Sequence, residues 1–274
     1  MADTFALMSD VHTHRSDNVL TDAVLTDDVL AHSAPTDDLL TDVLPEALVE
    51  IAASAGLVAV RGKPMLRGWS HVVAFITVAT LGAILVAISD TSSRERWWLA
   101  VYVAGTLAMF GVSALYHRLP WRPRALRIMG KLDHSTIFLA IAGAYTPTAI
   151  VALDGWQRPT VLAAVWGGTL VGVLLEWLPV HVPRWLFTSV YVIVGWSAVL
   201  ALPQLFRGLG ATGFSLLLGG GILYTLGAVV YATKRPDPWP RVFGFHEVFH
   251  AFTLGGAGCH LAVISFAVIP RMAG

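Results

Sequence analysis

Apolar stretches long enough to cross a lipid bilayer dominate this sequence from residue 68 onward. A spanning helix needs about 20 mostly apolar residues, and only helices or closed barrels satisfy their backbone hydrogen bonds in lipid. The predicted spans are residues 69–89, 97–117, 132–152, 160–178, 185–205, 211–232 and 246–269. Because runs of this length favour helices over strands, the sequence predicts an all-α integral membrane protein with a bundle of seven transmembrane helices.

The composition supports a membrane protein and narrows the range of partners. Charged residues make up 13% of the chain, against about 25% in typical soluble domains. The formal net charge is zero, so nothing in the composition points to nucleic acid. The single cysteine, Cys259, excludes an intramolecular disulfide, and its place in an apolar span favours an inert packed thiol.

Residues 1–60 differ in composition from the rest of the chain. They hold 11 of the 18 acidic residues but a single base, Arg15. They lack the compact apolar core of a signal peptide, and their repeated Leu-Thr-Asp triplets fit neither the helical nor the strand period. We expect a disordered, acidic cytoplasmic tail over residues 1–60 and a membrane domain over residues 61–274.

The distribution of Lys and Arg predicts the orientation in the membrane. With seven spans, 13 basic residues fall on the side of the N-terminus and five on the opposite side. The positive-inside rule therefore places the N-terminus in the cytoplasm and the C-terminus outside.

This topology brings polar residues from three distant spans to one depth near the cytoplasmic face. The second span runs inward and ends at His117, the third starts at Asp133, and the seventh starts at His246. His250 lies one helical turn after His246 on the same face, and Ser113 has the same spacing from His117. Because ionisable residues inside a membrane are costly, their convergence indicates a functional site.

The types of these residues predict a metal centre. Two histidines from one helix and one from another provide three nitrogen ligands and leave a fourth position for water, as in catalytic zinc sites. Zinc lowers the pKa of such a water to about 7, and Asp133 would hold the water or accept its proton. We therefore expect zinc to be bound by His117, His246 and His250.

Each residue also has a simpler interpretation. A single interfacial histidine is often a polar anchor, and His134 could face the headgroups. Asp133 could pair with Arg127 or Lys131 at a helix start, where a negative charge suits the helix dipole. Ser113 could bond only to the backbone of its own helix. Their shared depth favours the metal centre over these separate explanations.

Two further features of the seventh span need explanation. His246-Glu247-Val248-Phe249-His250 matches the HEXXH pattern of zinc proteases, in which the glutamate is the general base. No acidic residue follows Glu247 as a third ligand, so a membrane protease is less favoured, and Glu247 is expected at the cytoplasmic interface. His260 lies about 15 Å deeper than His250, so we expect it to form a hydrogen bond inside the bundle instead.

Three motifs in the membrane domain resemble the bacterial hemolysin III family, which is grouped with the progestin and adipoQ receptors, including the adiponectin receptors. The resemblance covers residues 64–270 and leaves out the acidic tail. The motifs are Ser113-Ala114-Leu115-Tyr116-His117, Leu132-Asp133-His134-Ser135-Thr136-Ile137-Phe138 with Ala142-Gly143-Ala144-Tyr145-Thr146-Pro147, and Gly244-Phe245-His246-Glu247-Val248-Phe249-His250.

The resemblance implies a seven-helix bundle with its N-terminus inside and a zinc ion near the cytoplasmic face. The three zinc-binding histidines of the family map onto His117, His246 and His250. The aspartate that contacts the zinc-bound water maps onto Asp133, and the nearby serine maps onto Ser113. Eukaryotic relatives usually carry tyrosine at the position of His134, which leaves its role open.

Three functions follow from the residues and the resemblance. A wider relationship to alkaline ceramidases implies zinc-dependent hydrolysis of a lipid amide or ester, with Asp133 and Ser113 as catalytic residues and a fatty-acyl lipid as substrate. The link of bacterial members to membrane-lipid homeostasis implies a non-catalytic sensor of the membrane with structural zinc. The family name implies pore formation and cytolysis, although no ring of charges lines the spans. The expected location is the bacterial plasma membrane, and the oligomeric state is left open.

Overall fold

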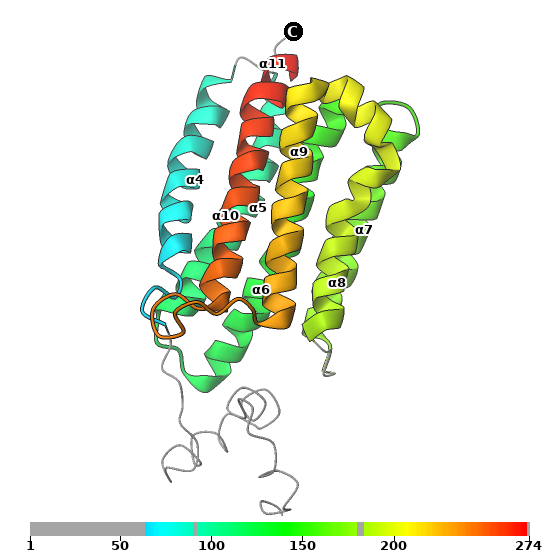
Figure 1. The fold of residues 1–274 in the computed structure, drawn as a ribbon. Helices are drawn as coiled ribbons and strands as arrows, with labels where there is room; N and C mark the ends of the chain where they lie inside the picture. The colour runs from blue at the N-terminus through cyan, green and yellow to red at the C-terminus, as the bar shows by residue number, and fades with distance from the viewer. Residues whose placement is uncertain (1–63, 90–91, 180–183, 273–274) are drawn as a thin grey trace, which may run out of the picture. The chain divides into compact units, whose positions relative to one another are not determined.

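The computed structural model of this protein describes residues 64–89, 92–179 and 184–272. In these ranges the chain forms long helices joined by short connections (Figure 1). The predicted tail of residues 1–60 lies outside the described residues and stays a prediction. The elements are α4 (Trp69–Ile88), α5 (Ser93–Arg118), α6 (Pro123–Ala152), α7 (Gln157–Trp177), α8 (Arg184–Gly195), the 3₁₀ helix η2 (Trp196–Ala201), α9 (Leu202–Thr233), α10 (Phe245–Val263), the π-helical turn η3 (Ile264–Val268) and α11 (Ile269–Met272).

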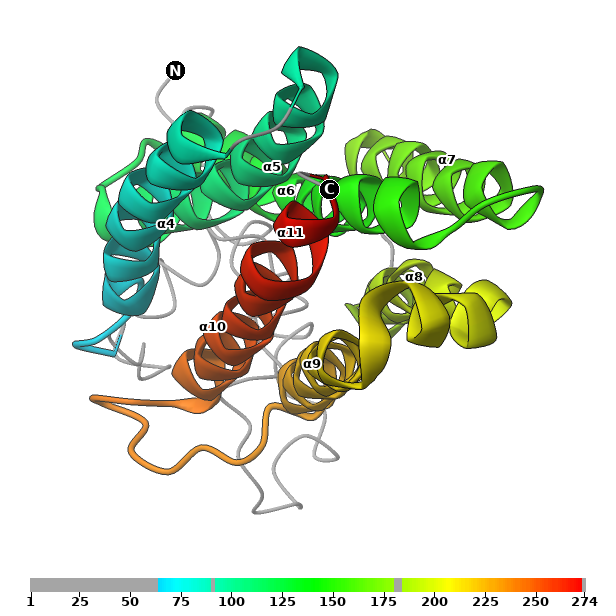
Figure 2. The same cartoon turned by 90° about the horizontal axis from the view of Figure 1, so that it is seen from above.

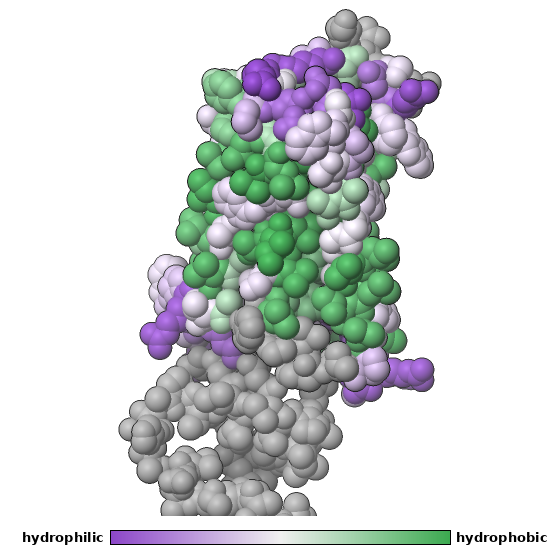
Figure 3. Space-filling model, turned by 90° about the vertical axis from the view of Figure 1, so that its right-hand side faces the viewer, coloured by the Kyte–Doolittle hydropathy of each residue, from purple (hydrophilic) through white to green (hydrophobic). Residues whose placement is uncertain are grey.

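The helices have the length and composition of membrane spans, which confirms an all-α, multi-pass membrane protein. The described residues contain six helical stretches that are long and apolar enough to cross a bilayer. On the face shown in Figure 3, hydrophobic residues form a band between more polar ends. Large apolar side chains such as Ile76, Leu170 and Ile193 are exposed on the outside of the bundle, as expected where lipid is the solvent.

One of these stretches contains two of the predicted spans. Leu186–Thr233 has 48 residues, and a straight helix of that length would be about 72 Å long, more than twice the thickness of a hydrocarbon core of about 30 Å. The chain instead turns through η2 and at Gly210, whose φ of 73° favours glycine. Beyond this turn α9 runs back beside α8 (Figures 1 and 2).

Proline begins two helices here, and one predicted boundary was wrong. Pro203, which was expected in a break between spans, lies in the first turn of α9, before the bend at Gly210. Pro123 begins α6, well before the predicted start at residue 132. Proline suits a first helical turn because its missing N–H would have no intrahelical partner there. As a result Asp133 lies ten residues inside α6 and does not open the helix.

The packing of the helices places the candidate site residues together. Each long helix contacts the next one along the chain, and α10 also contacts α4, so the bundle closes on itself (Figure 2). Glycines allow α5 and α6 to approach closely: a Cβ on Gly105 would lie 2.6 Å from the Leu139 carbonyl oxygen, and one on Gly143 would lie 3.0 Å from that of Val101. The end of α5 and the beginnings of α4 and α10 meet at one end of the bundle (Figure 1).

Candidate metal centre

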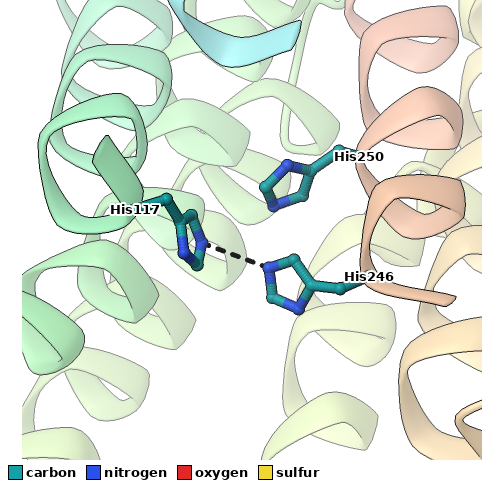
Figure 4. A group of neighbouring side chains, drawn as sticks. All are labelled: His117, His246 and His250. Carbon is teal, nitrogen blue, oxygen red and sulfur yellow. Dashed lines mark hydrogen bonds between the residues drawn. The ribbon is translucent and has the colours of Figure 1, made fainter. Parts of the chain in front are cut away.

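Three histidines from two helices that are distant in sequence converge at this end of the bundle. His117 lies in the last turn of α5, and His246 and His250 lie in the first turns of α10. The Nε2 atoms of His117 and His246 are 3.1 Å apart. One ligand nitrogen from each residue lies within 4.8 Å of the other two. Figure 4 shows the three rings turned toward the space between the two helices.

The geometry and chemistry of this cluster are consistent with a metal site. A tetrahedral zinc ion with Zn–N bonds of about 2.0–2.1 Å holds its ligand nitrogens about 3.3 Å apart. The 3.1 Å separation of the His117 and His246 nitrogens is close to this value, whereas separations of up to 4.8 Å would have to shorten on binding. His117 and His250 are buried, with exposed fractions of 8% and 1%. The neutral imidazole ring is the form in which histidine binds metals.

Asp133 and Ser113 lie close to the cluster, and their predicted catalytic role stays a prediction. The Asp133 Oδ2 atom lies 3.9 Å from the His117 Nε2 atom, and the Asp133 side chain is 14% exposed. Ser113 is buried and lines the same cavity as Asp133. Among the described residues, Asp133 forms no ion pair with Arg127 or Lys131, so the simpler explanation of this carboxylate is not supported.

Glu247 is buried inside the bundle, which corrects the expectation that its side chain faces outward at the cytoplasmic interface. Its side chain is 3% exposed and forms an ion pair with the Arg67 guanidinium group. Its Oε2 atom accepts a hydrogen bond of 2.8 Å from the Gly244 N–H group and so caps the helix that carries the two histidines. Because both carboxylate oxygens are engaged, Glu247 is a structural group, which argues against the protease interpretation of the HEXXH pattern.

His134 and His260 lie outside the three-histidine cluster. The His134 Nδ1 atom lies 3.3 Å from the Glu176 Oε1 atom, and the His134 side chain is 36% exposed. His260 packs edge-on against Tyr224, with ring centroids 5.5 Å apart. The hydrogen bond expected for His260 stays a prediction.

One residue of this region, His71, was not among the residues predicted from the sequence. This residue lies in the first turn of α4 and is only 3% exposed. Its ring stacks on the ring of His250, with centroids 3.7 Å apart and planes inclined by 15°. The depth argument that selected His117 would also have selected His71, because the first predicted span begins at the same membrane face.

A cavity connects the histidine cluster with the interior of the bundle. His71, Asp133, His246 and His250 line one part of it. Most of the remaining lining is apolar, and Leu202, Phe214 and Leu217 near the beginning of α9 lie toward the opposite end of the bundle. A mainly apolar cavity with a few polar groups gathered in one region is typical of a binding site for a small amphipathic molecule.

Comparisons with known proteins relate the chain to one family. Residues 60–261 match the model of the family described as "Haemolysin-III related". "Hemolysin-3" of Bacillus cereus is 34% identical over 170 residues, which cover 62% of this chain and 74% of that protein. "Heptahelical transmembrane protein ADIPOR2" of Oryza sativa subsp. japonica is 29% identical and covers 62% of this chain and 81% of that protein. "Adiponectin receptor protein" of Drosophila melanogaster is 26% identical and covers 74% of this chain and 50% of that protein.

Proposed function

This chain belongs to the haemolysin-III-related family, and we propose that it is a zinc-dependent hydrolase of acyl amide or ester lipids that acts in membrane-lipid homeostasis. One observation supports this proposal above all: two histidines of the cluster, His246 and His250, line one mainly apolar cavity together with Asp133 and Ser113. The histidines suit a metal, the carboxylate suits proton transfer, and the apolar lining suits an acyl chain.

We further propose a topology of seven passes with the N-terminus in the cytoplasm of a bacterial cell and the protein in its plasma membrane. The turn at Gly210 supports two passes within Leu186–Thr233. A relative whose name contains the word heptahelical supports the same number. The excess of basic residues on the N-terminal side supports the orientation.

His117, His246 and His250 would hold the zinc ion through neutral imidazole nitrogens. When bound, zinc supplies Lewis-acid polarisation of a carbonyl group and a hydroxide nucleophile at neutral pH. The lining of the cavity is mainly apolar, so charges on the protein would act there with less screening than in bulk water.

Asp133 would act as the general base and then as the general acid. In hydrolysis the acyl C–N or C–O bond breaks, and the oxygen of water joins the acyl carbon. Asp133 accepts the proton that this water loses and returns it to the departing nitrogen or oxygen. Ser113, which lines the same cavity from the neighbouring helix, would orient the Asp133 carboxyl group.

A test of this proposal uses the purified full chain in lipid nanodiscs with its zinc content measured. Ceramides and acyl ester lipids of several chain lengths are supplied, and released fatty acid is quantified by mass spectrometry. We expect release from at least one lipid class and loss of that release in the Asp133→Asn variant. Zinc-loaded protein that binds these lipids but releases no fatty acid from any of them would contradict the proposal.

A non-catalytic sensor of the membrane with structural zinc is the second candidate. The position of the cluster favours it, because a metal ion there would tie the end of α5 to the beginning of α10. In this case His117→Ala lowers thermal stability, whereas Asp133→Ala leaves the membrane-homeostasis phenotype unchanged. Loss of the phenotype in a stable Asp133→Ala protein would count against a purely structural metal.

A further inference from the structure

The unsatisfied buried polar atoms of this protein are concentrated on one pair of stacked histidines. Four buried side-chain nitrogen or oxygen atoms in the described residues lack a hydrogen-bond partner. Three of the four belong to this pair: Nδ1 and Nε2 of His71, and Nδ1 of His250. A buried polar group without a partner costs about 1–3 kcal/mol, so such a concentration calls for an explanation.

The position of His71 connects it to the proposed metal centre. His71 comes from α4, a helix that contributes no ligand to the three-histidine cluster. Its ring lies face to face with His250, and the edge of Phe110 contacts it with ring centroids 5.1 Å apart. His71 lines the same cavity as His246, His250 and Asp133. The ring is therefore held in place by aromatic contacts, while both of its nitrogens lack a hydrogen-bond partner within the protein.

We propose that His71 is a fourth histidine of the metal centre, a positioning residue whose ring nitrogens form hydrogen bonds with the species held there and raise the affinity for the metal. The inference rests on the proposed metal centre but not on hydrolysis. Residues that hydrogen-bond around a metal site typically change its affinity by about 10- to 100-fold. Simple aromatic packing would require the His71 ring but not its nitrogens.

The His71→Phe variant separates these two roles because it keeps a stacked ring and removes both nitrogens. The purified full chain is stripped of metal with a chelator and titrated with Zn²⁺ in competition with a chromophoric chelator. We expect His71→Phe to bind Zn²⁺ about 10- to 100-fold more weakly than the wild type. The metal-free variant should be at least as thermally stable as the metal-free wild type, because an apolar ring replaces unpaired buried nitrogens.

His260→Phe is the matched control, since it also removes a histidine that lines the cavity. His260 lies about 15 Å along α10 from His250, so its replacement should leave Zn²⁺ affinity unchanged. A second variant, His71→Asn, keeps polar atoms but loses the stacked ring. It should bind Zn²⁺ more tightly than His71→Phe, and the reverse order would overturn the role of the nitrogens.

The outcomes separate this inference from the proposed function. Equal Zn²⁺ affinity of His71→Phe and the wild type would overturn the role of His71 and leave the three-histidine site intact. A wild type that takes up no Zn²⁺ would overturn both proposals. Zinc binding that depends on His71 in a protein that hydrolyses no lipid would support this inference and refute the hydrolase.

Discussion

The Nε2 atoms of His117 and His246 face each other at 3.1 Å, although the two residues are 129 positions apart in the sequence. A direct hydrogen bond between two neutral imidazoles requires a proton on one of these nitrogens and leaves the other as an acceptor. A metal ion resolves this arrangement differently, because both nitrogens can then be unprotonated ligands. His250 completes the group from the next turn of α10.

Loss of one ligand should therefore remove the metal. We expect the wild type to copurify with stoichiometric zinc and His250→Ala to lose nearly all of it, because two histidines rarely hold zinc without a third ligand. Metal content is measured by mass spectrometry after purification without added zinc. Full retention of zinc by His250→Ala would place the metal elsewhere.

Asp133 should affect chemistry more than metal binding. Asp133→Asn keeps the shape of the side chain and removes its capacity to accept a proton, so turnover of the lipid substrate should fall by about 10²–10⁴-fold. The zinc content should stay near that of the wild type. Both quantities are measured on the same preparation, and a variant that loses zinc together with activity would identify Asp133 as a ligand instead.

The Arg67–Glu247 ion pair should contribute to stability and not to catalysis. Arg67→Ala leaves the buried Glu247 charge without its partner, and the side chain of Arg67 is 19% exposed. Breaking a buried ion pair costs about 3–5 kcal/mol. We expect the free energy of unfolding to fall by an amount near the lower end of this range. Denaturant unfolding in detergent measures this loss.

Glu247→Gln is the companion variant for the same ion pair. A glutamine can keep the hydrogen bond to the Gly244 N–H group, so the stability loss should be smaller than in Arg67→Ala. Turnover per bound zinc should be unchanged. A large fall in turnover in a folded, zinc-loaded Glu247→Gln protein would revive the general-base role of the HEXXH pattern.

The close approach of α5 and α6 should depend on glycine. In Gly105→Ala the new Cβ would lie 2.6 Å from the Leu139 carbonyl oxygen, so the helices must separate, at a cost of about 1–3 kcal/mol. Thermal unfolding of the detergent-solubilised protein measures the effect. Gly167→Ala is the control on α7, where a Cβ meets nothing within 4 Å. An unchanged unfolding temperature for Gly105→Ala would show that α5 and α6 can separate without a loss of stability.

Part of the site could be predicted because topology alone relates distant residues by depth. The spans at 97–117 and 246–269 were long and apolar, so the depths of His117 and His246 followed from counting passes. Their four-residue spacings to Ser113 and His250 then defined helix faces. The start of α6 was misplaced because Pro123 and the basic residues that follow it looked like a loop.

The sequence by itself determined the membrane class, the metal-type residues and their common depth, because hydropathy and helical period act along each helix separately. Only the tertiary structure decided which side chains touch. The stacking of His71 on His250, the pairing of Arg67 with Glu247 and the reversal of the chain at Gly210 depend on how each helix is rotated about its axis and where it bends. In a bundle surrounded by lipid, the rotation of each helix is set by its packing against neighbouring helices. The hydropathy of a single helix contains little information about that packing.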